Sequence, residues 1–123
     1  MDSLKQKFAE KALILYKELR AINEEHGDKV MGEVTLNQIT GGARGIKMMV
    51  WETSQLDAVK GIRFRGYSIP EVKELLPSGP QGEPLPEGLF WLMLTGDIPT
   101  EAEVNGLTKD WQNRSEVPKQ VYT

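Results

Sequence analysis

The sequence predicts a mainly α fold that carries one small β-hairpin. Apolar residues recur at three- and four-residue steps near the start, and helix-start signals recur near residues 68 and 100. Apolar and polar residues alternate between residues 48 and 65, which is the pattern of strands. We therefore expect helices over residues 3–26 and 68–123, with short strands and a glycine-rich loop over residues 32–66 between them.

The first expected helix covers residues 3–26 and has one apolar face. Ser3 and Gln6 match a capping box at its start, and Gly27 can end it in the left-handed conformation. His26 lies in its last turn, where we expect a surface residue favoured by the helix dipole. The apolar face consists of Leu4, Phe8, Ala12, Leu15, Tyr16, Leu19 and Ile22.

The middle of the chain predicts short strands. Residues 32–39 alternate weakly and indicate one strand. Met49 and Trp51 indicate a second, and Ile62 and Phe64 a third. We expect residues 48–65 to form a hairpin whose loop covers residues 53–61.

Two capping boxes mark helix starts in the second half. Ser68 and Glu71 form one, with proline in the first turn, and Thr100 and Glu103 form the other. Residues 88–96, GLFWLMLTG, are apolar on every side, and their flanking glycines favour a short helix over a buried strand. A further helix is expected to begin at Pro118. The expected inward faces are Val72, Leu75 and Leu76, and then Val104, Leu107 and Trp111.

Composition excludes several functions. A chain of 123 residues with net charge −3 lacks the basic surplus of nucleic-acid binders, and no apolar run approaches the ~20 residues that span a bilayer. The absence of cysteine excludes disulfides and thiolate metal sites, and a single histidine excludes a two-histidine acid–base pair. We therefore expect no metal, no nucleic-acid partner and no membrane partner. The first residues show neither a signal peptide nor a transit peptide pattern.

The glycine-rich stretch TGGARGIK, residues 40–47, is the candidate binding motif. It matches neither the P-loop nor the dinucleotide-binding fingerprint, because its glycines are wrongly spaced. Glycines still let backbone N–H groups converge on an anion, and Arg44 adds a planar fork that suits phosphate. Residues 41–66 carry five cations against two anions. The alternative is a solvated turn whose arginine pairs with a neighbouring carboxylate.

Two longer strings resemble the citrate synthase family of the eukaryotic mitochondrial type. These are GGARGIKMMVWETSQLDAVKGIRFRGYSIPE at residues 41–71 and EPLPEGLFWLMLTGDIPT at residues 83–100. The similarity extends from about residue 25 to residue 118. It implies that residues 1–123 form the amino-terminal portion of the large helical domain of such an enzyme.

The resemblance also implies a function. Citrate synthases are homodimers of the mitochondrial matrix that condense acetyl-CoA with oxaloacetate and water to give citrate and CoA. The family's catalytic histidine–aspartate pair would lie beyond residue 123, so this chain alone is expected to be inactive. CoA and acetyl-CoA are substrates, and no tightly bound cofactor is implied.

One functional residue of the family matches a position here. The arginine of the family's Gly-Gly-Met-Arg-Gly motif contacts CoA phosphates and matches Arg44, with Gly42 and Gly45 shaping the loop. Arg63 and Arg65 are expected on the polar face of a strand, in internal salt bridges. Ala43 replaces the usual methionine, which predicts looser packing under the loop.

The turn before the third strand also departs from the family. Residues 58–61, Ala-Val-Lys-Gly, replace the usual Pro-Asp-Glu-Gly, so the geometry of the hairpin turn is open. A second functional reading also remains open. In it, the chain is a short, non-catalytic product that acts as an interaction or assembly module.

Overall fold

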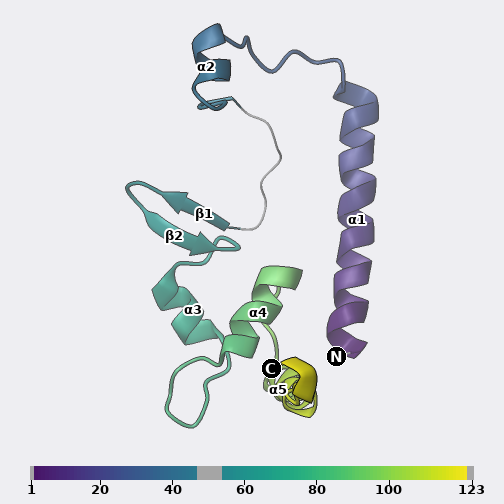
Figure 1. The fold of residues 1–123 in the computed structure, drawn as a ribbon, viewed down its shortest axis with the longest axis vertical. Helices are drawn as coiled ribbons and strands as arrows, with labels where there is room; N and C mark the ends of the chain where they lie inside the picture. Colours follow the sequence, from purple (N-terminus) through teal and green to yellow (C-terminus); the bar gives the residue numbers. More distant parts are fainter. Residues whose placement is uncertain (1, 47–53, 122–123) are drawn as a thin grey trace. The chain divides into compact units, whose positions relative to one another are not determined.

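The computed structural model describes residues 2–46 and 54–121, and it is mainly helical (Figure 1). Over these residues, five α-helices accompany one two-stranded sheet, which confirms the predicted fold class. The helices are α1 (Asp2–His26), α2 (Leu36–Thr40), α3 (Ile69–Leu75), α4 (Pro86–Thr95) and α5 (Glu101–Asn113), with a 3₁₀ turn η1 (Lys119–Val121). The strands are β1 (Ser54–Asp57) and β2 (Gly61–Phe64).

The chain divides into two compact units. Unit 1 comprises Met1–Ala12 and Glu52–Thr123, and it holds the hairpin, α3, α4, α5 and the start of α1. Unit 2 is Leu13–Trp51, with the rest of α1, α2 and the described part of the glycine-rich loop. No helix among the described residues is long and apolar enough to cross a membrane.

Helix α1 has nearly the predicted extent, but the predicted capping residues do not form its ends. It begins at Asp2, so Ser3 is helical and cannot be the extended N-cap residue; Gln6 donates to Glu10 instead, at 3.1 Å. The helix ends at His26, as expected, but Gly27 does not adopt the left-handed conformation. A side chain at this position would clash, because a Cβ on Gly27 would meet the Asn23 carbonyl oxygen.

The apolar face of α1 is largely uncovered in this chain. Leu4 is buried and packs with Trp91 and Leu107 in one core cluster. Further along, Tyr16 and Ile22 are about 60% exposed, at 61% and 58%. The periodicity therefore predicted the helix correctly, whereas burial is limited to its start.

The predicted hairpin is present, with a shorter turn than expected. β1 and β2 pair antiparallel, with Leu56 opposite Ile62. Residues 54–57 had been assigned to the loop, which is wrong, and the strand predicted at Met49 and Trp51 lies outside the described residues. The turn needs only residues 58–60, because the Asp57 carboxylate closes it.

Asp57 also fixes the geometry of the hairpin turn, whose residues differ from those usual in the family. Its Oδ1 accepts hydrogen bonds from the backbone N–H groups of Lys60 at 2.7 Å and Val59 at 2.8 Å. These bonds, that of Lys60 first, lower the pKa of Asp57 below its usual value. Gly61 follows with φ of 77°, a conformation that glycine adopts without steric penalty. The hairpin therefore closes without the family's usual turn residues.

Both predicted capping boxes in the second half are confirmed. The Glu71 carboxylate accepts from the Ser68 backbone N–H at 2.7 Å, and Glu103 does the same for Thr100 at 2.8 Å. Val72 of helix α3 and the C-cap residue Leu76 are buried, but Leu75 is 46% exposed, so its predicted inward orientation is wrong. After α5, the segment near residue 118 continues as the short 3₁₀ turn η1 rather than an α-helix.

Helix α4, predicted from GLFWLMLTG, is the centre of the core of unit 1. Trp91 is 1% and Leu92 0% exposed, and each belongs to a different core cluster. Leu92 packs with Val72 and Leu76 of the α3 region. Phe90, on another face of α4, is 41% exposed and meets Trp111 edge-on, with ring centroids 5.2 Å apart.

Arg65 does not lie on the strand where it was predicted. It lies just after β2 with φ of 50°, and it hydrogen-bonds backbone carbonyls at the end of α4. Its Nε donates to Met93 O at 2.9 Å and its Nη2 to Leu94 O at 3.4 Å. The last carbonyls of a helix lack intrahelical donors and attract a cation, so Arg65 caps α4, a role that the sequence did not predict. Arg63 behaves as predicted, because its Nη1 lies 3.6 Å from Glu71 Oε2.

Candidate functional site

The glycine-rich loop follows a short helix that the alternation of residues 32–39 had suggested was a strand. Helix α2 occupies Leu36–Thr40, so the strand prediction is wrong there. Thr35 and Gln38 form a complete capping box at its start. The Thr-x-x-Gln spacing was the sequence signal that should have outweighed the weak alternation.

The loop is held in shape by its own backbone. The N–H of Gly41 donates to Asn37 O at 2.9 Å, and that of Ala43 donates to Gln38 O at 2.7 Å. The N–H groups of Gly42 and Ile46 also donate to carbonyls of this segment, at 3.3 and 3.2 Å. Most of the loop therefore folds back onto α2 and itself.

Three residues of the loop have positive φ. Gly42 has φ of 80° and Gly45 has φ of 75°, which suits glycine. Ala43 has φ of 61°, a left-handed conformation that is unfavourable for a residue with a Cβ. The two glycines therefore allow the left-handed turns of this loop, and the left-handed backbone of Ala43 is strained.

The loop's bonds leave few groups to receive an anion. Four backbone N–H groups are already committed to carbonyls, whereas those of Arg44 and Gly45 donate to no carbonyl of a described residue. The Arg44 side chain is exposed and forms no ion pair with any carboxylate in the described part of the chain. Within the described part of the loop, Arg44 is therefore the strongest anion-binding group.

The cations of residues 41–66 are divided between the two units. Arg63 and Arg65 lie in unit 1, where Glu71 and the end of α4 engage them. Arg44 lies in unit 2, and Lys47 is outside the described residues. The case for an anion site consequently depends on the loop itself.

A hollow of about 210 Å³ lies beside the loop within unit 2. It is lined by Met31, Gly32, Glu33, Val34, Gln38, Gly45 and Ile46. Gln38 and Gly45 connect it to the segment that carries Arg44. Sequence reasoning had not singled out Gln38.

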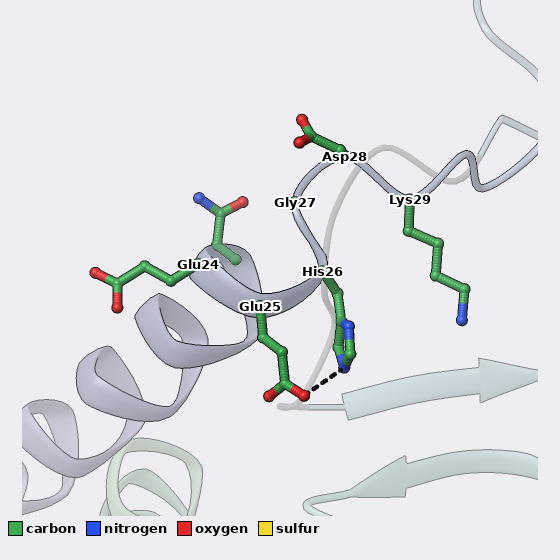
Figure 2. Close-up of a pocket in the computed structure, with 7 residues that line it drawn as sticks. Glu24, Glu25, His26, Gly27, Asp28 and Lys29 are labelled. Atoms are coloured by element: carbon green, nitrogen blue, oxygen red, sulfur yellow. Dashed lines mark ion pairs between the residues drawn. The ribbon is translucent and has the colours of Figure 1, made fainter.

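A second hollow surrounds the end of α1 and contains the single histidine (Figure 2). Figure 2 shows His26 and Glu25 pointing toward each other, and the His26 Nε2 to Glu25 Oε1 distance is 3.7 Å. Both side chains are exposed, as expected for a surface histidine. Among the described residues, no group of three or more His, Asp or Glu side chains is placed to hold a metal ion.

The class of protein follows from these features and from comparison with known families. The structure defines a mainly helical chain with a small hairpin and a cationic glycine-rich loop. A family model described as citrate synthase, C-terminal domain, matches residues 42–123, about two thirds of the chain. The chain belongs to the citrate synthase family, which confirms the resemblance of the two strings.

Several curated relatives are similar over almost the whole chain. A mitochondrial citrate synthase of Aspergillus niger is 58% identical over 118 residues, covering 95% of this chain and 25% of the relative. That of Saccharomyces cerevisiae is 52% identical over 121 residues, covering 98% of this chain and 25% of the relative. A mitochondrial 2-methylcitrate synthase of Yarrowia lipolytica is 54% identical over 121 residues, 98% of this chain and 26% of the relative.

The chain spans about a quarter of the length of these curated relatives. Its position within the family protein, predicted as the amino-terminal portion of the large helical domain, stays a prediction. The same holds for the role of Arg44.

Proposed function

We propose that this chain is part of a citrate synthase that condenses acetyl-CoA with oxaloacetate and water to give citrate and CoA. In this proposal, Arg44 contacts a CoA phosphate, and Gly42 and Gly45 shape the loop around it. The complete enzyme would act as a homodimer in the mitochondrial matrix. Residues 1–123 would supply scaffold and this contact, with no catalytic residue among them.

The observation that carries the proposal is the state of the Arg44 side chain. It is exposed on a loop whose backbone is tied down, and no described carboxylate neutralises it. A guanidinium matches phosphate oxygens in a planar, two-pronged geometry. The alternative role, in which Arg44 ties the loop to a neighbouring acid, finds no partner among the described residues.

The Arg44→Ala substitution tests the proposal in a complete enzyme. A suitable protein carries these 123 residues in place of the matching quarter of the Aspergillus niger citrate synthase. We expect the KM for acetyl-CoA to rise about tenfold, because a hydrogen bond to a charged group contributes about 1.5–3 kcal/mol and exposure weakens it. The KM for oxaloacetate should stay unchanged. Steady-state kinetics with each substrate varied in turn provides the measurement.

Arg20→Ala is the matched control. Arg20 is an exposed arginine on α1 that pairs with Glu24 at 2.7 Å, so its removal changes the charge equally without touching the loop. Raised ionic strength should weaken acetyl-CoA binding more in the unsubstituted enzyme than in Arg44→Ala. An acetyl-CoA dependence that Arg44→Ala leaves unaltered would remove Arg44 from the site.

The similarity to a 2-methylcitrate synthase supports a second candidate reaction. A synthase of 2-methylcitrate requires an acyl-CoA with one more carbon than acetyl-CoA, and the CoA phosphates are the same in both. Arg44 would therefore serve either reaction. Comparing kcat/KM for acetyl-CoA and propionyl-CoA in the native full-length protein decides between the two.

A further inference from the structure

We propose that Gln38 is a positioning residue for Arg44: it fixes helix α2 to the loop, so that binding of the CoA phosphate depends on it. This inference rests on the proposed function of Arg44. It concerns a residue that touches the loop and does not itself contact the substrate.

Gln38 joins the start of α2 to the loop through three of its groups. Its side-chain Oε1 accepts from the Thr35 backbone N–H at 2.9 Å and from Thr35 Oγ1 at 3.2 Å. Its backbone N–H donates to Thr35 Oγ1 at 3.3 Å, which completes the capping box. Its carbonyl accepts the N–H of Ala43, directly before Arg44, at 2.7 Å.

The side chain of Gln38 also lies against the other side of the loop. A Cβ added at Gly45 would stand 3.8 Å from Gln38 Nε2, and both residues line the hollow beside the loop. Gln38 is half-buried, whereas every other residue from 31 to 42 is exposed. The residues on both sides of Arg44 are thus in reach of Gln38.

The loop needs such support because its conformation is unfavourable by itself. Ala43 and the two glycines have positive φ, and a non-glycine residue holds that conformation only where neighbouring bonds impose it. The bond from Ala43 requires the Gln38 carbonyl to stay in place. That carbonyl belongs to a helix of five residues, which is marginal without its cap.

The test compares Gln38→Ala, Arg44→Ala and the double variant in the chimeric complete enzyme described above. We expect Gln38→Ala to raise the KM for acetyl-CoA about threefold to tenfold, the effect of losing the side-chain half of the capping box, with kcat and the oxaloacetate KM unchanged. In the Arg44→Ala background, Gln38→Ala should add nothing, because a positioning residue acts through the residue that it positions. Non-additivity is the readout that a purely structural role would not produce.

Two further variants sharpen the test. Gln38→Glu keeps a capping oxygen for Thr35 and places a negative charge beside Gly45, so it should raise the acetyl-CoA KM more than Gln38→Ala does, most strongly at low salt. Asn37→Ala is the matched control, because Asn37 lies on the same helix and contributes its backbone carbonyl to the loop. It should leave both KM values unchanged.

The outcomes separate this inference from the proposed function. If Arg44→Ala alters the acetyl-CoA dependence and Gln38→Ala does not, Gln38 has no positioning role and the function of Arg44 stands. If the two effects add fully, Gln38 acts independently of Arg44 and the inference is refuted. If Arg44→Ala has no effect, the proposed function itself fails.

Hydrogen exchange supplies a measurement that does not depend on activity. In the chimeric complete enzyme, Gln38→Ala should speed exchange of the Ala43 amide at least threefold relative to Asn37→Ala. Equal exchange in the two variants would show that the Gln38 side chain does not hold the loop, and would overturn the inference.

Discussion

Replacing Arg65 by alanine should loosen the end of helix α4. Arg65 Nε donates to Met93 O at 2.9 Å, and Nη2 donates to Leu94 O at the longer distance of 3.4 Å. These carbonyls lie in the last turn of α4, where no further helical N–H follows to satisfy them. The substitution therefore removes a charged donor from part-buried acceptors.

The size of the effect follows from these contacts. One good hydrogen bond from a charged donor contributes about 1.5–3 kcal/mol, and a cation at a helix C-terminus adds about 0.3–1 kcal/mol. The long second bond contributes little. We therefore expect a loss of about 2–3 kcal/mol in the free energy of opening α4, which corresponds to roughly 30- to 150-fold faster exchange.

Hydrogen exchange of the peptide that contains α4 measures this loss directly. Arg65→Gly is an informative companion, because Arg65 has φ of 50° and glycine relieves that strain by about 1 kcal/mol. Arg65→Gly should therefore exchange more slowly than Arg65→Ala. Arg63→Ala is the control, because Arg63 is an exposed neighbour whose ion pair with Glu71 spans 3.6 Å. An α4 peptide that exchanges within twofold of the unsubstituted chain in Arg65→Ala would refute this reasoning.

Two further predictions concern unit 1. Leu92→Ala should lower the free energy of unfolding of unit 1 by about 2–5 kcal/mol in a urea titration, because Leu92 is 0% exposed and its removal leaves a cavity. Phe90→Ala, at a position that is 41% exposed, should lower this free energy clearly less in the same titration. Glu103 has a lowered pKa: burial opposes the shift, but hydrogen bonds from Thr100 and Lys7 outweigh it. The ionised carboxylate therefore stabilises the fold above the ordinary pKa of an unfolded glutamate, and this contribution is lost as pH falls through the lower pKa of the folded state. In Glu103→Gln the urea midpoint should fall less steeply between pH 5 and pH 3; equal slopes would show that Glu103 does not contribute to acid sensitivity.

Capping boxes in the sequence predicted where helices α3 and α5 begin. The boxes at Ser68 and Thr100 place polar acceptors three residues from the groups that they bind, so the contact is decided within one turn. The same type of signal at Thr35 was present but was outweighed by a weak alternation. At Ser3 the pattern matched, yet the helix extends past it to Asp2. A capping pattern therefore shows where a helix can start, and flanking residues decide whether it does.

The candidate site could likewise be predicted from the sequence only in part. Arg44 was predicted from the glycine-rich string and from the resemblance to a family, and its side chain is exposed, as the proposed contact with a ligand requires. The proposed role of Gln38 was not predicted, because it depends on a bond from Ala43, five residues later, and on the position of Gln38 beside Gly45. No periodic pattern encodes such a contact.

By itself, the sequence determined the family, the helical class, the helices that begin at Ser68 and Thr100, and the hairpin, because these depend on motifs and on contacts between near neighbours in the chain. Tertiary structure alone decided that Arg65 caps α4, almost thirty residues away, and that, among the described residues, Leu4 is the buried member of the apolar face of α1. The physical reason is that burial and long-range hydrogen bonds depend on which elements pack together. Periodicity reports which face of an element is apolar, and it carries no information on what covers that face.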